Sequence, residues 1–300
     1  MGPSPDSVPP SSGAGRSRAL QDLIALLDLE PLGDGLFRGL SPKDRWQRVF
    51  GGQVLGQALI AAARTVEGRG CHSLHAYFLN PGDPRMPILY RVENSRDGGS
   101  FSARRVTASQ DKRTIFTMSA SFQKAEQGPE HQTEMPDVPD PGALKTETEW
   151  RSEFAEKLPL EIRAWLERDR PVEVRPVLPA NRFAPGKHPP LQILWLRAAG
   201  SLPGIPALHQ CVLAYASDMT LLDTALMPHG YTLFTPHLQL ASLDHAMWFH
   251  RPFRADEWLL YVQESPVAAD ARGFNRGTIY ARGGALVASV VQEGLIRGRS

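Results

Sequence analysis

Cysteine is scarce in this chain: Cys71 and Cys211 are the only two in 300 residues. Two cysteines are too few for a disulfide framework or for a cysteine-based metal site. Both lie in apolar stretches of sequence, so we expect buried thiols without a chemical role. The histidines are not spaced for a zinc site with a third ligand either. The sequence therefore predicts a protein without a metal or another cofactor.

A surplus of charge of one sign is also missing, since 33 Lys and Arg oppose 32 Asp and Glu. Nucleic acid or an anionic membrane is therefore not an expected partner. No apolar run reaches the length of about 18 residues that a membrane-spanning helix needs. Residues 1–18 are rich in Pro, Ser and Gly, lack the apolar stretch of a signal peptide, and predict a disordered tail. The ending Gly298-Arg299-Ser300 differs from a Ser-Lys-Leu peroxisomal signal, so we expect a cytoplasmic protein.

Three common catalytic signatures are absent as well. The chain has no G-x-S-x-G nucleophile turn, no G-x-x-x-x-G-K-[ST] phosphate loop and no H-E-x-x-H zinc helix. The segment Gly13-Ala14-Gly15 follows no strand and is not a dinucleotide-binding fingerprint. These absences argue against an α/β-hydrolase, a nucleoside triphosphatase and a dinucleotide-dependent enzyme.

What the chain does contain is a weak internal repeat. HSLHAYFLNPGDPRMPILYRVENSRDGGSFSARRV and TIFTMSASFQ have counterparts in ASLDHAMWFHRPFRADEWLLYVQESPVAADARGFNRG and ALVASVVQEG. Three residue pairs align at offsets of 168 to 170 residues: His75 with His245, Arg104 with Arg272, and Gln123 with Gln292. We predict two copies of one domain, residues 19–123 and 191–300, joined by a Pro-rich, charged linker over residues 124–190.

Each copy has the pattern of a helix followed by an antiparallel sheet, which predicts the α+β class. Residues 51–63 are apolar nearly all round, so we expect a buried helix whose Gly and Ala residues let a sheet approach closely. Its counterpart is expected to begin near Asp218. Residues 88–92 and 258–262 are rich in β-branched, aromatic and other apolar residues, which is typical of strands. An amphipathic helix is expected over residues 20–27.

Seven segments give the chain a specific resemblance. They are LEPL (29–32), LFRG (36–39), VFGGQVLGQAL (49–59), FSARRV (101–106), LDHAMWFHRPF (243–253), ARGFNRG (271–277) and VQEG (291–294). In this order they resemble the acyl-CoA thioesterase II (TesB-like) family over residues 20–297. The resemblance implies a double hotdog, which is two tandem copies of a central helix wrapped by an antiparallel sheet. It also implies hydrolysis of fatty acyl-CoA to free fatty acid and CoA by a homodimer or homotetramer.

The resemblance assigns the catalytic residues to the second copy. The family's catalytic Asp, hydroxyl residue and Gln fall on Asp218, Ser242 and Gln292, arranged around a water without a covalent intermediate. The family usually has Thr where this chain has Ser242. A carboxylate can accept a proton from water, while a hydroxyl and an amide can orient the water. A helix that begins after Asp218 would add backbone N–H groups facing developing negative charge.

Each assignment has a structural alternative. Asp218 could cap the helix expected after it, Ser242 could bond only to a strand backbone, and Gln292 could be an ordinary buried amide. The first copy has no matching acid, because Val49 or Phe50 takes the place that corresponds to Asp218. We therefore expect the first copy to be a degenerate site.

Arginines and histidines near the predicted sheet are further candidates. Arg104, Arg272 and Arg276 could bind the CoA phosphates through their guanidinium groups, or could be solvated residues at strand ends. Four histidines are more typical of structural residues than of bases or metal ligands: His72, His75, His245 and His250.

Two rival functions stay open at this point. One is a catalytically silent acyl-CoA-binding protein. The other is a hotdog enoyl-CoA hydratase or dehydratase, which would need a histidine to move a proton at carbon. The first histidine after Asp218 along the same segment is His229, beyond Pro228.

Overall fold

The computed structural model describes residues 16–42, 48–155, 169–179, 186–233 and 235–298. Within these ranges every strand belongs to one antiparallel sheet, ordered β1-β2-β4-β5-β6-β3-β10-β13-β12-β11-β8-β7, with β9 paired to β13 outside this path. The strands are β1 (Glu30–Gly33), β2 (Leu36–Gly39), β3 (Gly70–Phe78), β4 (Ile88–Asp97), β5 (Phe101–Gln110), β6 (Arg113–Gln123), β7 (Val172–Pro176), β8 (Leu191–Ala198), β9 (Leu238–Ser242), β10 (Asp244–Phe249), β11 (Leu259–Ala269), β12 (Arg272–Ala281) and β13 (Leu286–Gly298). The helices are α1 (Arg18–Leu27), α2 (Gly51–Ala63), α3 (Glu147–Ala155), α6 (Pro206–Ser217) and α7 (Asp223–Leu226), with short 3₁₀ turns η1 (Pro141–Ala143) and η2 (Met227–His229).

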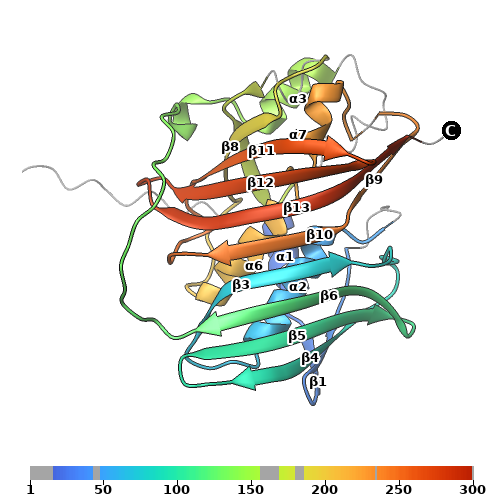
Figure 1. Cartoon of the computed structure of the whole chain (residues 1–300), viewed down its shortest axis with the longest axis vertical. Helices are drawn as coiled ribbons and strands as arrows, with labels where there is room; N and C mark the ends of the chain where they lie inside the picture. Colours follow the sequence, from blue (N-terminus) through green and yellow to red (C-terminus); the bar gives the residue numbers. More distant parts are fainter. Residues whose placement is uncertain (1–15, 43–47, 156–168, 180–185, 234, 299–300) are drawn as a thin grey trace, which may run out of the picture.

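The sheet has an approximate two-fold symmetry. Strands β3 and β10 pair antiparallel at its centre, where Leu74 lies opposite Met247. Outward from this centre, β6, β5, β4, β2 and β1 on one side match β13, β12, β11, β8 and β7 on the other. Figure 1 shows α2 and α6 together behind the central strands. Two copies of a central helix against an antiparallel sheet form the double hotdog of the α+β class that the sequence predicts.

The second central helix lies earlier in the chain than predicted. It is α6, which covers Pro206–Ser217 and has Asp218 as its C-terminal cap. Proline suits a helix start, because the first N–H groups of a helix have no internal partner. The stretch after Asp218 has helical periodicity too, but it forms only α7 and η2, which contains Pro228. The predicted helix start near Asp218 is therefore wrong. The alternative role of Asp218 as an N-cap is wrong as well, because Asp218 is a C-terminal cap.

The ends of the two central helices differ in charge. In α2 the C-terminal cap is Arg64, which donates to the Leu29 carbonyl oxygen and forms an ion pair with Asp28. In α6 the corresponding cap is Asp218. Val49 precedes α2, so the prediction that Val49 or Phe50 takes the place of Asp218 in the first copy is wrong.

The repeat is present in the strands, but the three aligned residue pairs do not correspond. Each pair joins a buried residue to a more exposed one: His245 is fully buried and His75 exposed, Arg104 buried and Arg272 exposed, and Gln292 fully buried whereas Gln123 is partly exposed. A shift of one residue moves a side chain to the other face of a sheet. Tyr90 and Tyr261 do correspond, because both are fully buried and both donate to a central helix, at Gln57 Oε1 and the Ser217 carbonyl oxygen.

Two glycines of α2, Gly52 and Gly56, bring the two central helices together. A Cβ atom at Gly52 would lie 2.5 Å from the Tyr215 carbonyl oxygen, and one at Gly56 would lie 3.1 Å from that of Cys211. Ordinary side chains at these positions would force α2 and α6 apart. The absence of a Cβ therefore sets the contact between the two halves.

Buried amides attach neighbouring segments to α2. Gln53 Nε2 donates to the Leu40 carbonyl oxygen, and Gln57 Nε2 donates to those of Leu26 and Leu40. Leu26 belongs to α1, whose Leu20, Leu23 and Leu27 are buried, as the amphipathic pattern predicts. These bonds hold α1 and the segment after β2 against the first half.

The described parts of residues 124–190, which the sequence predicts to be a linker, are packed into the fold. Strand β7 pairs with β8 at the outer edge of the sheet. Side chains from residues 135–144 pack on the cluster formed by Trp195, Leu260 and Tyr280. The predicted tail, residues 1–18, lies mostly outside the described residues. Among the helices that the structure describes, none is long and apolar enough to cross a membrane.

We expect Gly52→Ala to destabilise the protein, because the added methyl group would meet the Tyr215 carbonyl oxygen at 2.5 Å. Overpacking costs roughly 1–3 kcal/mol, whereas alanine gains about 1 kcal/mol over glycine within a helix. The midpoint of thermal unfolding should fall. Gly204→Ala is the control, since a methyl group there meets no atom within 4 Å. An equal midpoint for both variants would contradict the close packing of α2 on α6.

Candidate active site

Asp218, Ser242 and Gln292 meet at one point although they come from three elements. Asp218 caps α6, Ser242 ends β9, and Gln292 lies within β13. Gln292 Nε2 donates to Asp218 Oδ1 at 2.5 Å and to Ser242 Oγ at 2.9 Å. The Ser242 hydroxyl donates to Asp218 Oδ1 at 3.3 Å. We call these three residues the trio.

The N-terminus of α2, in the first half of the chain, faces the same carboxylate. The Gly52 backbone N–H donates to Asp218. A Cβ atom at Gly51 would lie 2.7 Å from Asp218 Oδ2 and 3.0 Å from the Phe78 ring. The N–H group that faces the trio thus belongs to the first turn of α2, not to a helix after Asp218, which corrects the prediction. The candidate site lies between the two halves.

Burial raises the pKa of Asp218 from 3.8 to about 6. Hydrogen bonds from Gln292, Ser242 and the Gly52 N–H oppose this rise in pKa, and the negative charge of Asp223 adds to it. A general base works best when its pKa lies near the operating pH. The surroundings of Asp218 therefore suit proton transfer near neutral pH.

The candidate histidines bond to serines or contact aromatic rings and do not touch the trio. His245 Nε2 lies 2.9 Å from Ser217 Oγ, and burial lowers the pKa of His245 to about 3. The others make similar contacts: His72 with Ser121, His250 with Ser289, and His75 in a T-shaped contact with the Trp248 ring. His245 is therefore a neutral side chain bonded to the residue that precedes Asp218.

The cysteines are buried, and no metal site is visible in the part of the chain that the structure describes. Burial raises the pKa of Cys71 to about 12 and that of Cys211 well above its usual value. Both thiols therefore stay protonated, as the sequence suggests. Within the described ranges, no group of three or more His, Cys, Asp or Glu side chains is arranged to hold a metal ion.

The three candidate arginines are not brought to the trio. Arg104 is buried and donates to five acceptors: Thr65 Oγ1, the carbonyl oxygens of Thr65, Arg96 and Ala103, and Asp97 Oδ1. Its N–H groups are thus committed within the fold. Arg272 and Arg276 pair with Glu293 and Glu264. Because Arg276 follows Asn275, which lies opposite Gln292, its side chain points to the other face of the sheet.

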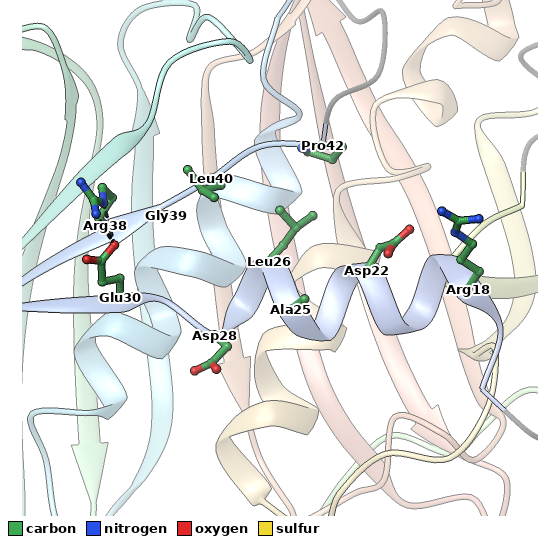
Figure 2. A pocket seen from close by; sticks show the side chains of 10 residues that line it. All are labelled: Arg18, Asp22, Ala25, Leu26, Asp28, Glu30, Arg38, Gly39, Leu40 and Pro42. Carbon is green, nitrogen blue, oxygen red and sulfur yellow. Dashed lines mark hydrogen bonds and ion pairs between the residues drawn. The ribbon is translucent and has the colours of Figure 1, made fainter.

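A cavity of about 510 Å³ lies along α1 and contains none of the trio. Figure 2 shows its lining, with Arg38 and Glu30 at one end and Arg18 and Asp22 at the other. Arg38 forms an ion pair with Glu30. Its remaining lining residues are Ala25, Leu26, Asp28, Gly39, Leu40 and Pro42. Positive and negative side chains share the cavity, so its lining does not select an anionic ligand.

Sequence reasoning missed the contribution of Gly51 and Gly52 to the site. Their backbone groups, not side chains, face Asp218, and a backbone N–H leaves no residue-type signature. The pair of glycines directly before a buried apolar helix is the one feature that could have indicated it.

Asp218→Asn should make the protein more stable at pH 8. The pKa of Asp218 is about 6 in the folded protein against 3.8 ordinarily, so ionisation disfavours the folded state above pH 6. This penalty is absent below the unfolded pKa. The free energy of unfolding should rise by roughly 1–3 kcal/mol at pH 8, and the gain should vanish toward pH 4. Denaturant unfolding at both pH values measures this. Exposed Asp34, changed to Asn, is the control, and equal shifts in both variants would contradict the prediction.

Comparisons with known proteins agree with the fold. Residues 42–123 match the family model "Acyl-CoA thioesterase N-terminal domain" and residues 163–295 match "Acyl-CoA thioesterase". Acyl-coenzyme A thioesterase 8 of Homo sapiens is 43% identical, over 92% of this chain and 88% of its own length. The crystal structure of acyl-CoA thioesterase II TesB2 from Mycobacterium marinum has a TM-score of 0.76 and 46% identity, over 93% and 99% of the two chains. A hot dog fold protein from Alicyclobacillus acidocaldarius, with a TM-score of 0.73, 18% identity and coverage of 93% and 99%, supports the fold alone. The chain belongs to the acyl-CoA thioesterase family, whose members hydrolyse thioesters.

Proposed function

We propose that the protein hydrolyses fatty acyl-CoA to free fatty acid and CoA with a water molecule that Asp218 activates. The observation that carries this proposal is the convergence of Gln292 Nε2 and Ser242 Oγ on one carboxylate oxygen of Asp218. This carboxylate also lies at the N-terminus of α2. Membership of the acyl-CoA thioesterase family supports the substrate class.

Each group of the site has a role in this reaction. Asp218 accepts a proton from water while the water oxygen bonds to the thioester carbonyl carbon. Gln292 and Ser242 hold the carboxylate and the water in place. The N-terminus of α2, the positive end of the helix dipole, stabilises the negative charge on the carbonyl oxygen. The carbon–sulfur bond then breaks, and CoA thiolate leaves and takes up the proton.

The surroundings of Ser242 support water rather than the serine as nucleophile. A nucleophilic serine needs a base that removes its proton, most often a histidine. Ser242 Oγ donates to Asp218 Oδ1 at 3.3 Å, which is longer than the usual O–H···O distance of about 2.7 Å, and it also accepts from Gln292 Nε2. The nearby His245 is bonded to Ser217 instead. We therefore propose that no covalent acyl-enzyme forms.

The two rival functions lack such support. A hydratase or dehydratase needs a proton donor or acceptor at carbon, and no hydrogen bond between a histidine and the trio occurs in the described ranges. A silent acyl-CoA binder would have no use for a buried carboxylate held by two side chains. Assay of palmitoyl-CoA with a thiol reagent separates these functions. The cytoplasmic location and the homodimer or homotetramer remain predictions.

Substitutions in the trio should lower kcat without unfolding the protein. Asp218→Asn should cost roughly 10²–10⁴-fold, the usual contribution of a general base, and Gln292→Ala somewhat less. Ser242→Thr keeps the hydroxyl and should be nearly neutral, whereas Ser242→Ala should impair turnover. The losses should not add, because the three groups act as a unit. Steady-state kinetics with palmitoyl-CoA measure each variant.

The matched control for Gln292→Ala is Gln123→Ala, since Gln123 lies on the exposed side of β6 and donates to Glu126. It should keep wild-type kcat. Near wild-type turnover in a folded Asp218→Asn protein would refute the role of Asp218 as the base. A covalent acyl group trapped on Ser242 would refute the water mechanism.

The pH dependence follows from the pKa of Asp218, which is about 6. Only the ionised carboxylate accepts a proton, so kcat/KM should fall about tenfold per pH unit below pH 6 and level off above it. A profile of kcat/KM against pH measures this. Asp218→Asn should lose the inflection, and an unchanged inflection in that variant would assign it to another group.

Activity should survive exhaustive dialysis against EDTA, because the proposed chemistry assigns no step to a metal. Hydrolysis rates before and after chelation, at equal protein concentration, are the measurement. Loss of turnover that one specific divalent cation restores would overturn the mechanism.

A further inference from the structure

A second buried amide lies beside the trio. Asn275 on β12 is directly opposite Gln292 on β13, and both side chains are fully buried. Directly opposed residues in an antiparallel pair point to the same face, with Cβ atoms about 5 Å apart. The carboxamide of Asn275 is therefore a neighbour of the carboxamide that holds Asp218.

Both amides have an acceptor without a partner among the described residues. Gln292 Oε1 and Asn275 Oδ1 are buried and make no hydrogen bond. The Asn275 NH₂ group has one long bond, 3.4 Å to the Gly273 carbonyl oxygen. An NH₂ group carries two donors, so one N–H of Asn275 is not engaged. The neighbouring Gln292 Oε1 is an acceptor that no donor satisfies. Burying an unpaired acceptor is costly, which favours a contact between the two amides.

On the face of β12 that carries Asn275, the next positions in either direction are glycines, Gly273 and Gly277. On the same face, a Cβ atom at Gly273 would lie 2.5 Å from Ala225 Cβ, and one at Gly277 would lie 2.4 Å from the Tyr261 ring. Neighbouring side chains thus fill the space at both glycines. Asn275 is the side chain that β12 directs toward Gln292.

The orientation of the Gln292 amide decides what Asp218 experiences. As placed, its NH₂ group faces Asp218 Oδ1 and Ser242 Oγ. A half-turn of the amide would set Oε1 against the carboxylate oxygen, and two acceptors would then repel each other. A donor to Oε1 would add to the preference for the orientation that these two bonds already favour.

We propose that Asn275 is a positioning residue, which donates to Gln292 Oε1 and so keeps the Gln292 NH₂ group turned toward Asp218 and Ser242. The contact forms by a small rotation of the Asn275 side chain or through one water. This inference rests on the proposed function, because it assigns Asn275 a role through Gln292. Asn275 itself touches no reacting atom.

The test compares Asn275→Val, which removes the donor, with Asn275→Thr, which retains one. Asn275→Val should lower kcat roughly 10-fold, less than loss of a direct transition-state contact, with KM little changed. Asn275→Thr should lose less. The acid limb of kcat/KM should move to higher pH in Asn275→Val, because the bond from Gln292 lowers the pKa of Asp218. Asp223 and Tyr261, which also interact with Asp218, are unchanged in these variants.

A double-mutant cycle separates positioning from packing. In a Gln292→Ala background, Asn275→Val should cause no further loss of kcat, because the amide that it orients is gone. An equal loss in both backgrounds, or an acid limb that does not move, would overturn the proposal. Gln110→Leu removes a buried amide far along the chain and should leave the acid limb in place. If Asn275→Val does not fold, Asn275→Thr carries the same comparison, with its smaller loss again confined to the background that keeps Gln292.

The two proposals fail differently. If Gln292→Ala retains wild-type kcat, the role of the trio is wrong whatever Asn275 does. If Gln292→Ala is impaired while both folded Asn275 variants keep wild-type kcat and pH profile, only the role of Asn275 is wrong.

Discussion

The contact between α2 and α6 is the constraint on which the rest of the structure depends. Gly52 and Gly56 let the two helices approach until a Cβ atom would meet backbone oxygen. This contact places the first turn of α2 beside the carboxylate that ends α6. The two halves share one sheet through β3 and β10, so helix contact and strand pairing fix the same relative placement. A site that draws backbone groups from one half and side chains from the other needs both.

The electrostatics of the site oppose its stability. Asp218 is surrounded so that its ionised form is disfavoured, and hydrogen bonds from Gln292 and Ser242 recover only part of that cost. A carboxylate held in this way is a stronger base than one in water. Protein sites that carry out proton transfer commonly accept such a cost. Asn275, on the neighbouring strand β12, is a second buried polar group of this kind. Its burial also carries a cost, and its proposed role is to orient Gln292.

Sequence alone could predict the α+β double hotdog and the three side chains of the trio, because motifs and strand patterns survive in local sequence. The predicted start of the second central helix was wrong. The stretches before and after Asp218 are both apolar with helical periodicity, so the sequence does not show which of them forms the helix. The aligned pairs failed because the sequence does not reveal which face a residue takes when both faces carry small or polar residues. Arg104 resembles a surface arginine until Thr65 and Asp97 are brought to it. Asn275 was not predicted, because its proposed role depends on the residue that lies opposite it in the sheet, Gln292.

The two central helices end in different C-terminal caps, Arg64 and Asp218, which makes the two halves unequal. By its approximate symmetry the chain has a second place where a helix N-terminus meets the cap of the other helix. There the cap is Arg64, already engaged with Asp28, and the helix that faces it begins with Pro206, which has no N–H to donate. A cation cannot act as the base, so this mirror-image location is silent. Under the proposed mechanism, the duplicated fold therefore carries one catalytic centre for every two hotdog units.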